Sequence, residues 1–245
     1  MSKLTHLAAA LVLATSVTTV SAAPTLVFQT DFNGTLPAEI SPGTALLTGV
    51  QNYAGFGPLG NQFGGNFLRS GTGNTVTLQL NGLPAHNTIS LEFLFAAIDS
   101  LDGTGTFPAG DFFKIVFDGL TLFSESFANA VPSQIQSYVP PAGVELARHL
   151  DLGFSGPGSF FTDSAYNLGA DPRFANFAHS ASSATIEFFI FGPGNQSLDD
   201  ESWAMDNLRV SVTTNGTVIP EPGSLALLGV GLASLALMRR RRWPT

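Results

Sequence analysis

The chain has 245 residues, no cysteine and a net charge of −8 at pH 7. The missing cysteines exclude disulfides and thiol chemistry, and the negative charge disfavours binding to nucleic acid or anionic lipid. Charged residues make up only 11% of the chain, whereas glycine (26), proline (15) and phenylalanine (21) are abundant. This composition favours a globular protein rich in turns and strands.

The first 22 residues have the pattern of a secretory signal peptide. Lys3 lies in a short polar start, the apolar run Leu7–Val20 follows, and small residues precede a cut after Ala22. Cleavage one residue later satisfies the same rule, and an uncleaved N-terminal anchor is the alternative. We therefore predict an exported protein.

Residues 23–217 are long enough for one domain and are more acidic than the whole chain, because the basic ends are absent. They show no helical periodicity, internal repeat or low-complexity block. Short runs of alternating polarity are separated by turn residues, which predicts a single all-β domain, an antiparallel β-sandwich. The predicted strands are Thr25–Phe32, Thr75–Leu80, Thr88–Asp99, Phe112–Asp118, Leu120–Phe127, Ala184–Phe191 and Trp203–Thr213.

Other stretches of the domain are less regular. Residues 37–73 consist mostly of turns, and their glycine-rich part lacks the lysine of a phosphate-binding loop. Tyr53, Phe56 and Phe63 in this stretch either stack on sugar rings or are buried loop anchors, and the second role is commoner. Residues 144–152 fit a strand or one helical turn.

Aspartates at strand ends are the candidate metal ligands. Asp99, Asp111 and Asp206 share the face of the apolar residues in their strands, and Asp102 lies in the following loop. If the strands ending at Asp99 and starting at Asp111 pair across that loop, their carboxylates lie at the same end of the sheet. Buried carboxylates need partners, and Ca²⁺ prefers such oxygen ligands. The sequence therefore predicts a possible structural calcium site.

Simpler roles remain open for these residues. Aspartates at strand ends often accept backbone N–H groups of a turn, and the acidic run Asp199–Glu201 is either a solvated loop or the source of an additional ligand. Glu92 and Glu187 could form a glycosidase pair, but outward glutamates are usually solvated. No nucleophile motif is present and the four histidines lack metal-ligand spacing. We therefore assign no catalytic residue.

Segments 98–103, 110–113 and 202–210 resemble parts of jelly-roll modules such as carbohydrate-binding and lectin-like domains. In these modules the closing strand often carries an aspartate like Asp206, and calcium often braces the sandwich. The sequence departs from the pattern at Leu101, where a tryptophan is frequent. The resemblance implies a jelly-roll-like fold and an affinity for glycans.

The C-terminal stretch 218–245 combines three different pieces. Pro220-Glu221-Pro222 is followed by an apolar run, for which we predict a transmembrane helix over 223–238, and then by Arg239-Arg240-Arg241-Arg242. The uncharged run Leu225–Met238 forms a helix of about 21 Å, shorter than the hydrocarbon core of about 30 Å. The arginines act as a membrane stop and place the preceding domain across the membrane from the cytoplasm.

This arrangement resembles the PEP-CTERM sorting signal of Gram-negative bacteria. The resemblance implies an exosortase as partner, an inner-membrane-anchored precursor, cleavage near Pro220–Pro222, and release to the cell surface or extracellular matrix. We therefore expect a non-enzymatic structural or adhesive protein associated with extracellular polysaccharide, as in a biofilm. An extracellular carbohydrate-active enzyme resembling glycoside hydrolases is the alternative, whereas a solute receptor is disfavoured by the missing strand–helix alternation.

Overall fold

A computed structural model of the chain describes residues 23–104, 110–129, 134–154, 161–194, 196–214 and 229–232. Residues Ala23–Thr214 form one compact unit, and Met1–Ala22 with Asn215–Thr245 form a second. In the second unit only 229–232 are described, and they are helical. The predicted signal peptide, Pro220–Pro222 and Arg239–Arg242 lie outside the described residues, as does most of the predicted helix 223–238. Within the described part of the chain, no helix has the length and apolar character needed to cross a membrane.

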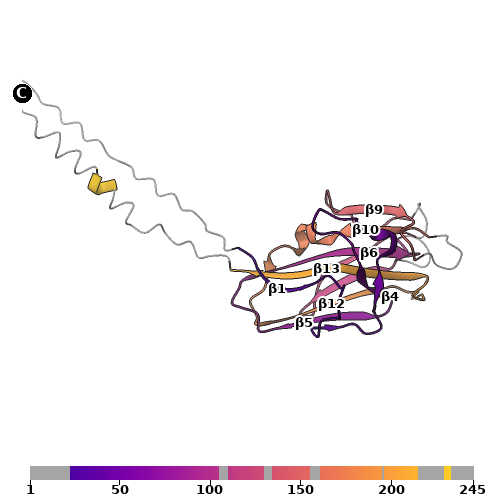
Figure 1. Cartoon of the computed structure of the whole chain (residues 1–245), viewed down its shortest axis with the longest axis horizontal. Coiled ribbons are helices and arrows are strands. Elements are labelled where there is room, and N and C mark those ends of the chain that lie inside the picture. Colours follow the sequence, from indigo (N-terminus) through magenta and orange to yellow (C-terminus); the bar gives the residue numbers. More distant parts are fainter. Residues whose placement is uncertain are drawn as a thin grey trace, which may run out of the picture. The chain divides into compact units, whose positions relative to one another are not determined.

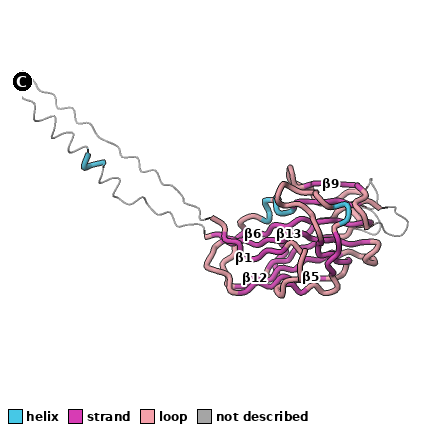
Figure 2. Tube along the Cα trace, in the orientation of Figure 1, coloured by secondary structure: helices cyan, strands magenta, loops and turns pink. Residues whose placement is uncertain are grey.

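The compact unit is built from strands, with three short 3-10 helices over the described ranges (Figure 2). The strands are β1 (Thr25–Thr30), β2 (Ile40–Ser41), β3 (Leu46–Gly49), β4 (Asn66–Gly71), β5 (Thr75–Asn81), β6 (Thr88–Asp99), β7 (Phe112–Phe117), β8 (Leu120–Ser126), β9 (Glu145–Leu150), β10 (Asp163–Asn167), β11 (Phe177–Ala178), β12 (Ser183–Phe191) and β13 (Glu201–Thr213). The helices are η1 (Gln51–Tyr53), η2 (Leu168–Ala170) and η3 (Pro172–Phe174).

These strands form two antiparallel sheets that lie face to face (Figure 1). The larger sheet has eight strands in the order β3-β4-β13-β6-β10-β9, with β1 paired to β13 and β11 paired to β6. The smaller sheet has five strands in the order β2-β5-β12-β7-β8. The predicted all-β antiparallel sandwich is therefore confirmed.

The main core lies between the two sheets and follows from the alternation of the strands. Residues 89, 91, 93, 95 and 97 of β6 all face it, and β12 contributes every second residue from Ala184 to Ile190. Aromatic side chains dominate its centre: the Phe113 ring lies 4.3 Å from Phe95 and 5.2 Å from Trp203, measured between centroids. Each such buried aromatic side chain contributes about 1.5–3 kcal/mol through removal of apolar surface from water.

A second, smaller core covers the outer face of the larger sheet. Alternate residues Leu94, Ala96 and Ile98 of β6 pack there against Tyr53 and Phe63. The Tyr53 hydroxyl donates a hydrogen bond to the Ala97 carbonyl oxygen at 3.1 Å. Both aromatic rings are buried, so they anchor the glycine-rich segment and are not available to stack on a ligand.

The irregular stretches contain more strand structure than the sequence predicts. Residues 37–73 include β2, β3 and β4, and 144–152 contain the strand β9 rather than a helical turn. β2 and β3 are too short to show an alternating pattern. They become strands because β2 pairs with β5 and β3 pairs with β4. In contrast, the hairpin predicted at Asp118-Gly119 is present: both residues have positive φ, 47° and 80°, as a two-residue turn between twisted strands requires.

The strands that end at Asp99 and start at Asp111 do not pair, so the condition for placing their carboxylates at one end of the same sheet is not met. The first strand, β6, belongs to the larger sheet, and the second, β7, belongs to the smaller sheet. The connection between them therefore crosses from one sheet to the other at the end of the sandwich. This crossing brings its two acidic residues next to the start of β13.

Candidate functional site: an acidic cluster and a polar groove

Three buried carboxyl groups meet at the end of the sandwich where the chain crosses between the sheets. Asp102 and Asp111 flank the connection from β6 to β7, and Glu201 is the first residue of β13. One oxygen from each carboxyl group lies within 4.8 Å of the others. Their exposed fractions are 7%, 3% and 0%.

Hydrogen bonds hold the two aspartates in place. The backbone N–H of Asp102 donates to Asp111 Oδ2 at 2.8 Å, and the N–H of Asp111 donates to the Asp102 carbonyl oxygen at 2.9 Å. The Gln134 side-chain amide donates to Asp102 Oδ1. The two ends of the connection are therefore bonded to each other, and the Asp111 carboxylate is oriented by a main-chain N–H and the Asp102 carboxylate by a side-chain amide.

Glu201 is the member of the cluster that sequence reasoning assigned to a loop. Its Oε1 accepts a hydrogen bond of 2.7 Å from the Gln196 side-chain amide. Its Oε2 is buried and has no hydrogen-bond partner among the described residues. Extending β13 backwards would have revealed Glu201, because it shares the alternation of Trp203 and Met205, which both face the main core.

The electrostatics of the cluster are unfavourable for three negative charges. Burial raises the pKa of all three carboxyl groups, and the neighbouring Asp111 carboxylate raises the pKa of Glu201 further. Among the described residues, no arginine, lysine or histidine forms an ion pair with any of the three. The site therefore has to take up protons or a cation.

Asp99 does not join this cluster, contrary to the sequence prediction. Its backbone is left-handed, with φ of 59°, which ends the regular alternation of β6. Its carboxylate lies 4.0 Å from the Arg69 guanidinium, and its N–H donates to Asp163 Oδ1 at 3.0 Å. Burial raises the pKa of Asp163 to about 7. Asp99 thus belongs to a separate polar group beneath the outer core.

Asp206 also lies apart from the cluster, for a reason visible in the register of β13. A β-bulge interrupts the pairing of β13 with β6 between Asp206 and Arg209, and Asn207 has a φ of 51°. The bulge shifts the alternation, so Asp206 does not share the face of Leu208 and Val210 as predicted. Its carboxylate accepts hydrogen bonds from the N–H groups of Gly64 (3.1 Å) and Asn207 (2.7 Å).

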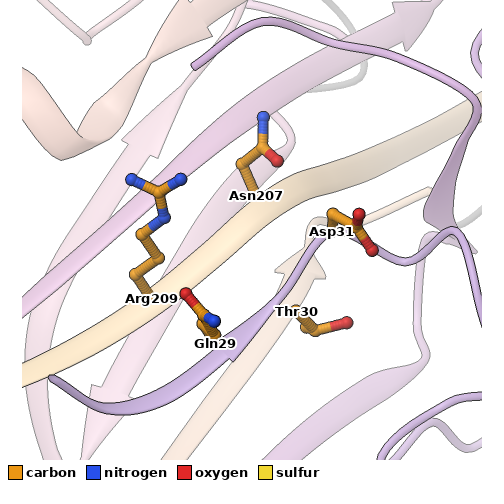
Figure 3. A pocket seen from close by; sticks show the side chains of 5 residues that line it. All are labelled: Gln29, Thr30, Asp31, Asn207 and Arg209. Carbon is orange, nitrogen blue, oxygen red and sulfur yellow. The ribbon is translucent and has the colours of Figure 1, made fainter. Parts of the chain in front are cut away.

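A polar groove runs along the outer side of the larger sheet, where β1 pairs with β13 (Figure 3). One cavity of about 350 Å³ is lined by Gln29, Thr30, Asp31, Asn207 and Arg209. A second cavity of about 400 Å³ shares Gln29 and Arg209 with the first and extends toward Glu92. The bulge in β13 therefore shapes a groove as well as redirecting Asp206.

The two glutamates considered as a glycosidase pair lie on different sheets. Glu92 is on β6, on the outer face of the larger sheet, whereas Glu187 is on β12 in the smaller sheet, facing away from the core. Two side chains on opposite outer faces of a sandwich cannot flank one glycosidic bond. The geometry therefore does not bring this pair together.

Comparison with known families identifies the C-terminal segment. The family model for the PEP-CTERM protein-sorting motif matches residues 218–242. The C-terminal segment is a PEP-CTERM sorting motif. The match spans Pro220–Pro222 and Arg239–Arg242, so it confirms the predicted sorting signal and indicates an exported protein that is processed by an exosortase. The PEP-CTERM motif assigns no family to the β-sandwich.

The β-sandwich shows only distant structural likenesses. A Paenibacillus cycloisomaltooligosaccharide glucanotransferase is 15% identical, with a TM-score of 0.35 over 79% of this chain and 19% of that one. A Clostridium thermocellum endo-1,4-beta-D-xylanase is 10% identical, with a TM-score of 0.33 over 79% and 30%. An insecticidal delta-endotoxin of Bacillus thuringiensis is 13% identical, with a TM-score of 0.32 over 69% and 24%. The chain thus spans less than a third of each, and no curated protein matches it.

Proposed function

We propose that this PEP-CTERM protein is a non-enzymatic surface protein that binds extracellular polysaccharide through the groove between β1 and β13. The sorting motif supports a location outside the cytoplasm, because proteins that carry such a motif are exported. The observation that carries the binding proposal is the pair of neighbouring polar cavities, which share Gln29 and Arg209 in their linings. An open groove along two strands suits an extended chain better than a compact small molecule.

The chemistry of the groove suits a hydroxyl-rich ligand. Gln29 and Asn207 offer amides, Thr30 offers a hydroxyl group, and Arg209 offers a planar set of N–H donors. Asp31 is an ionised acceptor, because a hydrogen bond from the Asn33 N–H lowers the pKa of its carboxyl group. Such mixed donors and acceptors are the groups that orient sugar hydroxyls.

The charges along the groove favour a neutral polysaccharide over an anionic one. Arg209 is the cation that lines both cavities, whereas Asp31 and Glu92 contribute negative charge. The surrounding chain is acidic as well. A polyanionic glycan would be repelled, so we propose a neutral polysaccharide as the ligand class.

The test is a binding assay of the purified chain on a panel of neutral and acidic polysaccharides, with affinity electrophoresis as readout. We expect retardation by neutral polymers and at least a tenfold loss of affinity in the Arg209→Ala variant. Glu187→Gln is the control, because it alters a polar side chain on the other sheet. Equal retardation of both variants, or binding to acidic polymers only, would exclude the groove as the proposed site.

The enzymatic alternative is tested with the same polymers. A hydrolase releases reducing ends with time, and a Glu92→Gln substitution would stop that release if Glu92 were catalytic. We expect no release above the buffer control from the native chain. Release that depends on Glu92 would replace the binding proposal with a carbohydrate-active enzyme.

A further inference from the structure

We propose that Asp102, Asp111 and Glu201 bind one divalent cation, Ca²⁺ by its ligand preference, that fastens the β6–β7 connection to the start of β13. This inference is independent of glycan binding, because the cluster and the groove involve different residues. It rests on two separate observations, the convergence of three carboxyl groups and a buried carboxylate oxygen without a partner.

The convergence provides the ligands. The three groups come from positions far apart in the sequence, yet one oxygen of each lies within 4.8 Å of the others. Hard oxygen ligands at such separations fit around a single ion of the Ca²⁺ type, which accepts six to eight oxygens in flexible geometry. The Asp102 N–H holds the Asp111 carboxylate in place, and the Gln134 side-chain amide holds the Asp102 carboxylate, so two of these ligands are positioned without a cation.

The second observation is the unsatisfied oxygen. Glu201 has an exposed fraction of 0%, and its Oε2 finds no donor in the described part of the chain. A buried carboxylate oxygen without a donor is destabilising by several kcal/mol unless a proton or cation compensates it. Since no lysine, arginine or histidine of the described residues forms an ion pair with the cluster, a bound cation supplies the missing positive charge.

The backbone packs closely around two of the three carboxyl groups. Gly192, directly after β12, approaches Asp111 so closely that a Cβ atom there would collide with the carboxylate. Gly103, next to Asp102, is closed off in the same way by the Ile135 carbonyl oxygen and the Ala128 side chain. Mg²⁺ keeps several water molecules and demands octahedral geometry, so the enclosed cluster favours Ca²⁺.

Binding of the cation links the two sheets at one end of the sandwich. The connection between the sheets contacts the segment before β13 where the N–H and hydroxyl groups of Ser100 donate to the Asp200 carbonyl oxygen, and Asp102 and Asp111 meet Glu201 in the cluster. One cation shared by the three carboxylates fastens both sheets at this end of a chain that has no disulfide. Binding to the folded state then raises the melting temperature.

The experiment is calcium titration of the full-length chain after chelator treatment, by isothermal calorimetry and by thermal unfolding. We expect binding of one Ca²⁺ per chain, a rise in Tm, and tenfold or weaker competition by Mg²⁺. The Glu201→Gln and Asp111→Asn variants lose both the heat and the Tm rise. Asp199→Asn is the matched control, because it removes the same charge from an exposed neighbour of the cluster.

Three results overturn the proposal. The first is a folded native chain, verified by circular dichroism, that neither releases heat nor shifts its Tm with Ca²⁺; this needs no variant. The second is tighter binding of Mg²⁺ than of Ca²⁺. The third is an undiminished calcium effect in Glu201→Gln, or in Asp102→Asn if the first variant does not fold. If calcium has no effect and Glu201→Gln raises the Tm in chelator, the carboxyl groups share protons instead.

Discussion

Burial of the Asp206 carboxyl group makes the stability of this protein depend on pH. Burial raises its pKa from 3.8 to about 7, although hydrogen bonds from the N–H groups of Gly64 and Asn207 oppose the shift. Between about pH 4 and pH 7 the folded chain keeps a proton that the unfolded chain has lost. The contribution of this group to stability is therefore complete below about pH 4 and disappears as the pH rises through 7.

We predict that the Asp206→Asn substitution flattens this pH dependence. A fully coupled proton changes the free energy of unfolding by about 1.4 kcal/mol per pH unit, so the slope of the variant should be shallower than the native slope by up to that amount between about pH 5 and pH 7. The measurement is urea unfolding at several pH values in the presence of chelator. The slope is the readout because asparagine also loses one of two accepted hydrogen bonds.

Asp31→Asn serves as the control for this prediction. The pKa of Asp31 is lowered, so its carboxyl group is ionised in the folded and unfolded chain throughout the same pH range. Its substitution should change the slope only slightly, because the Asp31 charge is the weakest of the influences that raise the pKa of Asp206. An Asp206→Asn variant with the native slope would show that Asp206 is ionised in the folded state.

At the scale of secondary structure, alternation predicts the strands that have one face in the core. β1, β5, β6, β7, β8, β12 and β13 were predicted within two residues at each end, and in β5, β6, β12 and β13 polar and apolar residues alternate over at least five positions. The two-residue strand β2 and the exposed strand β3 carry no such pattern and depend on their partners. The bulge in β13 was not predicted either, because nothing in Asp206-Asn207-Leu208 marks a shift of register except an asparagine that tolerates positive φ.

We predict that Asn207 tolerates glycine but not valine. Its φ of 51° is accessible to glycine and asparagine, whereas a β-branched side chain in this conformation is destabilised by about 1–3 kcal/mol. Asn207→Gly loses only the side-chain hydrogen bond to the Gln62 carbonyl oxygen, worth about 1 kcal/mol. The midpoints of urea unfolding measure both effects.

Ser211→Val is the matched control within the same strand. Ser211 pairs with Leu26 and Ser90 in extended backbone, where valine is favourable. We expect its midpoint to equal or exceed that of the native chain. Equal midpoints for Asn207→Val and the native chain would mean that the bulge rearranges without strain. The groove that the bulge shapes should then change in the Asn207→Val variant.

For the whole molecule, the sequence predicts the type of chemistry better than the position of the site. Asp102 and Asp111 were predicted to lie close together if β6 and β7 pair; they do lie close together, although these strands belong to different sheets. Glu201 joins them only because β13 lies beside β6, with Glu201 opposite Asp99 in the register. Strand order in a sheet is set by contacts distant in sequence, so no local pattern could have joined these three residues.

The sorting motif is a short linear signal, and its residues are therefore open to a test that leaves the β-sandwich intact. We predict that replacing Pro220, Glu221 and Pro222 with alanine in the full-length chain blocks processing in a host that contains an exosortase. The uncleaved chain should accumulate in the membrane fraction, whereas the native chain is released in a shorter form. Gel mobility of the membrane and extracellular fractions is the measurement.

Pro244→Ala is the control, because Pro244 lies outside the matched residues 218–242. It should be processed like the native chain, and circular dichroism of all three proteins should show the same strand content, since the substitutions lie outside the compact unit Ala23–Thr214. Release of the triple variant at the native rate would mean that export does not depend on the proline–glutamate–proline tripeptide. Retention of both variants would instead mean that processing also needs Pro244, beyond the matched motif.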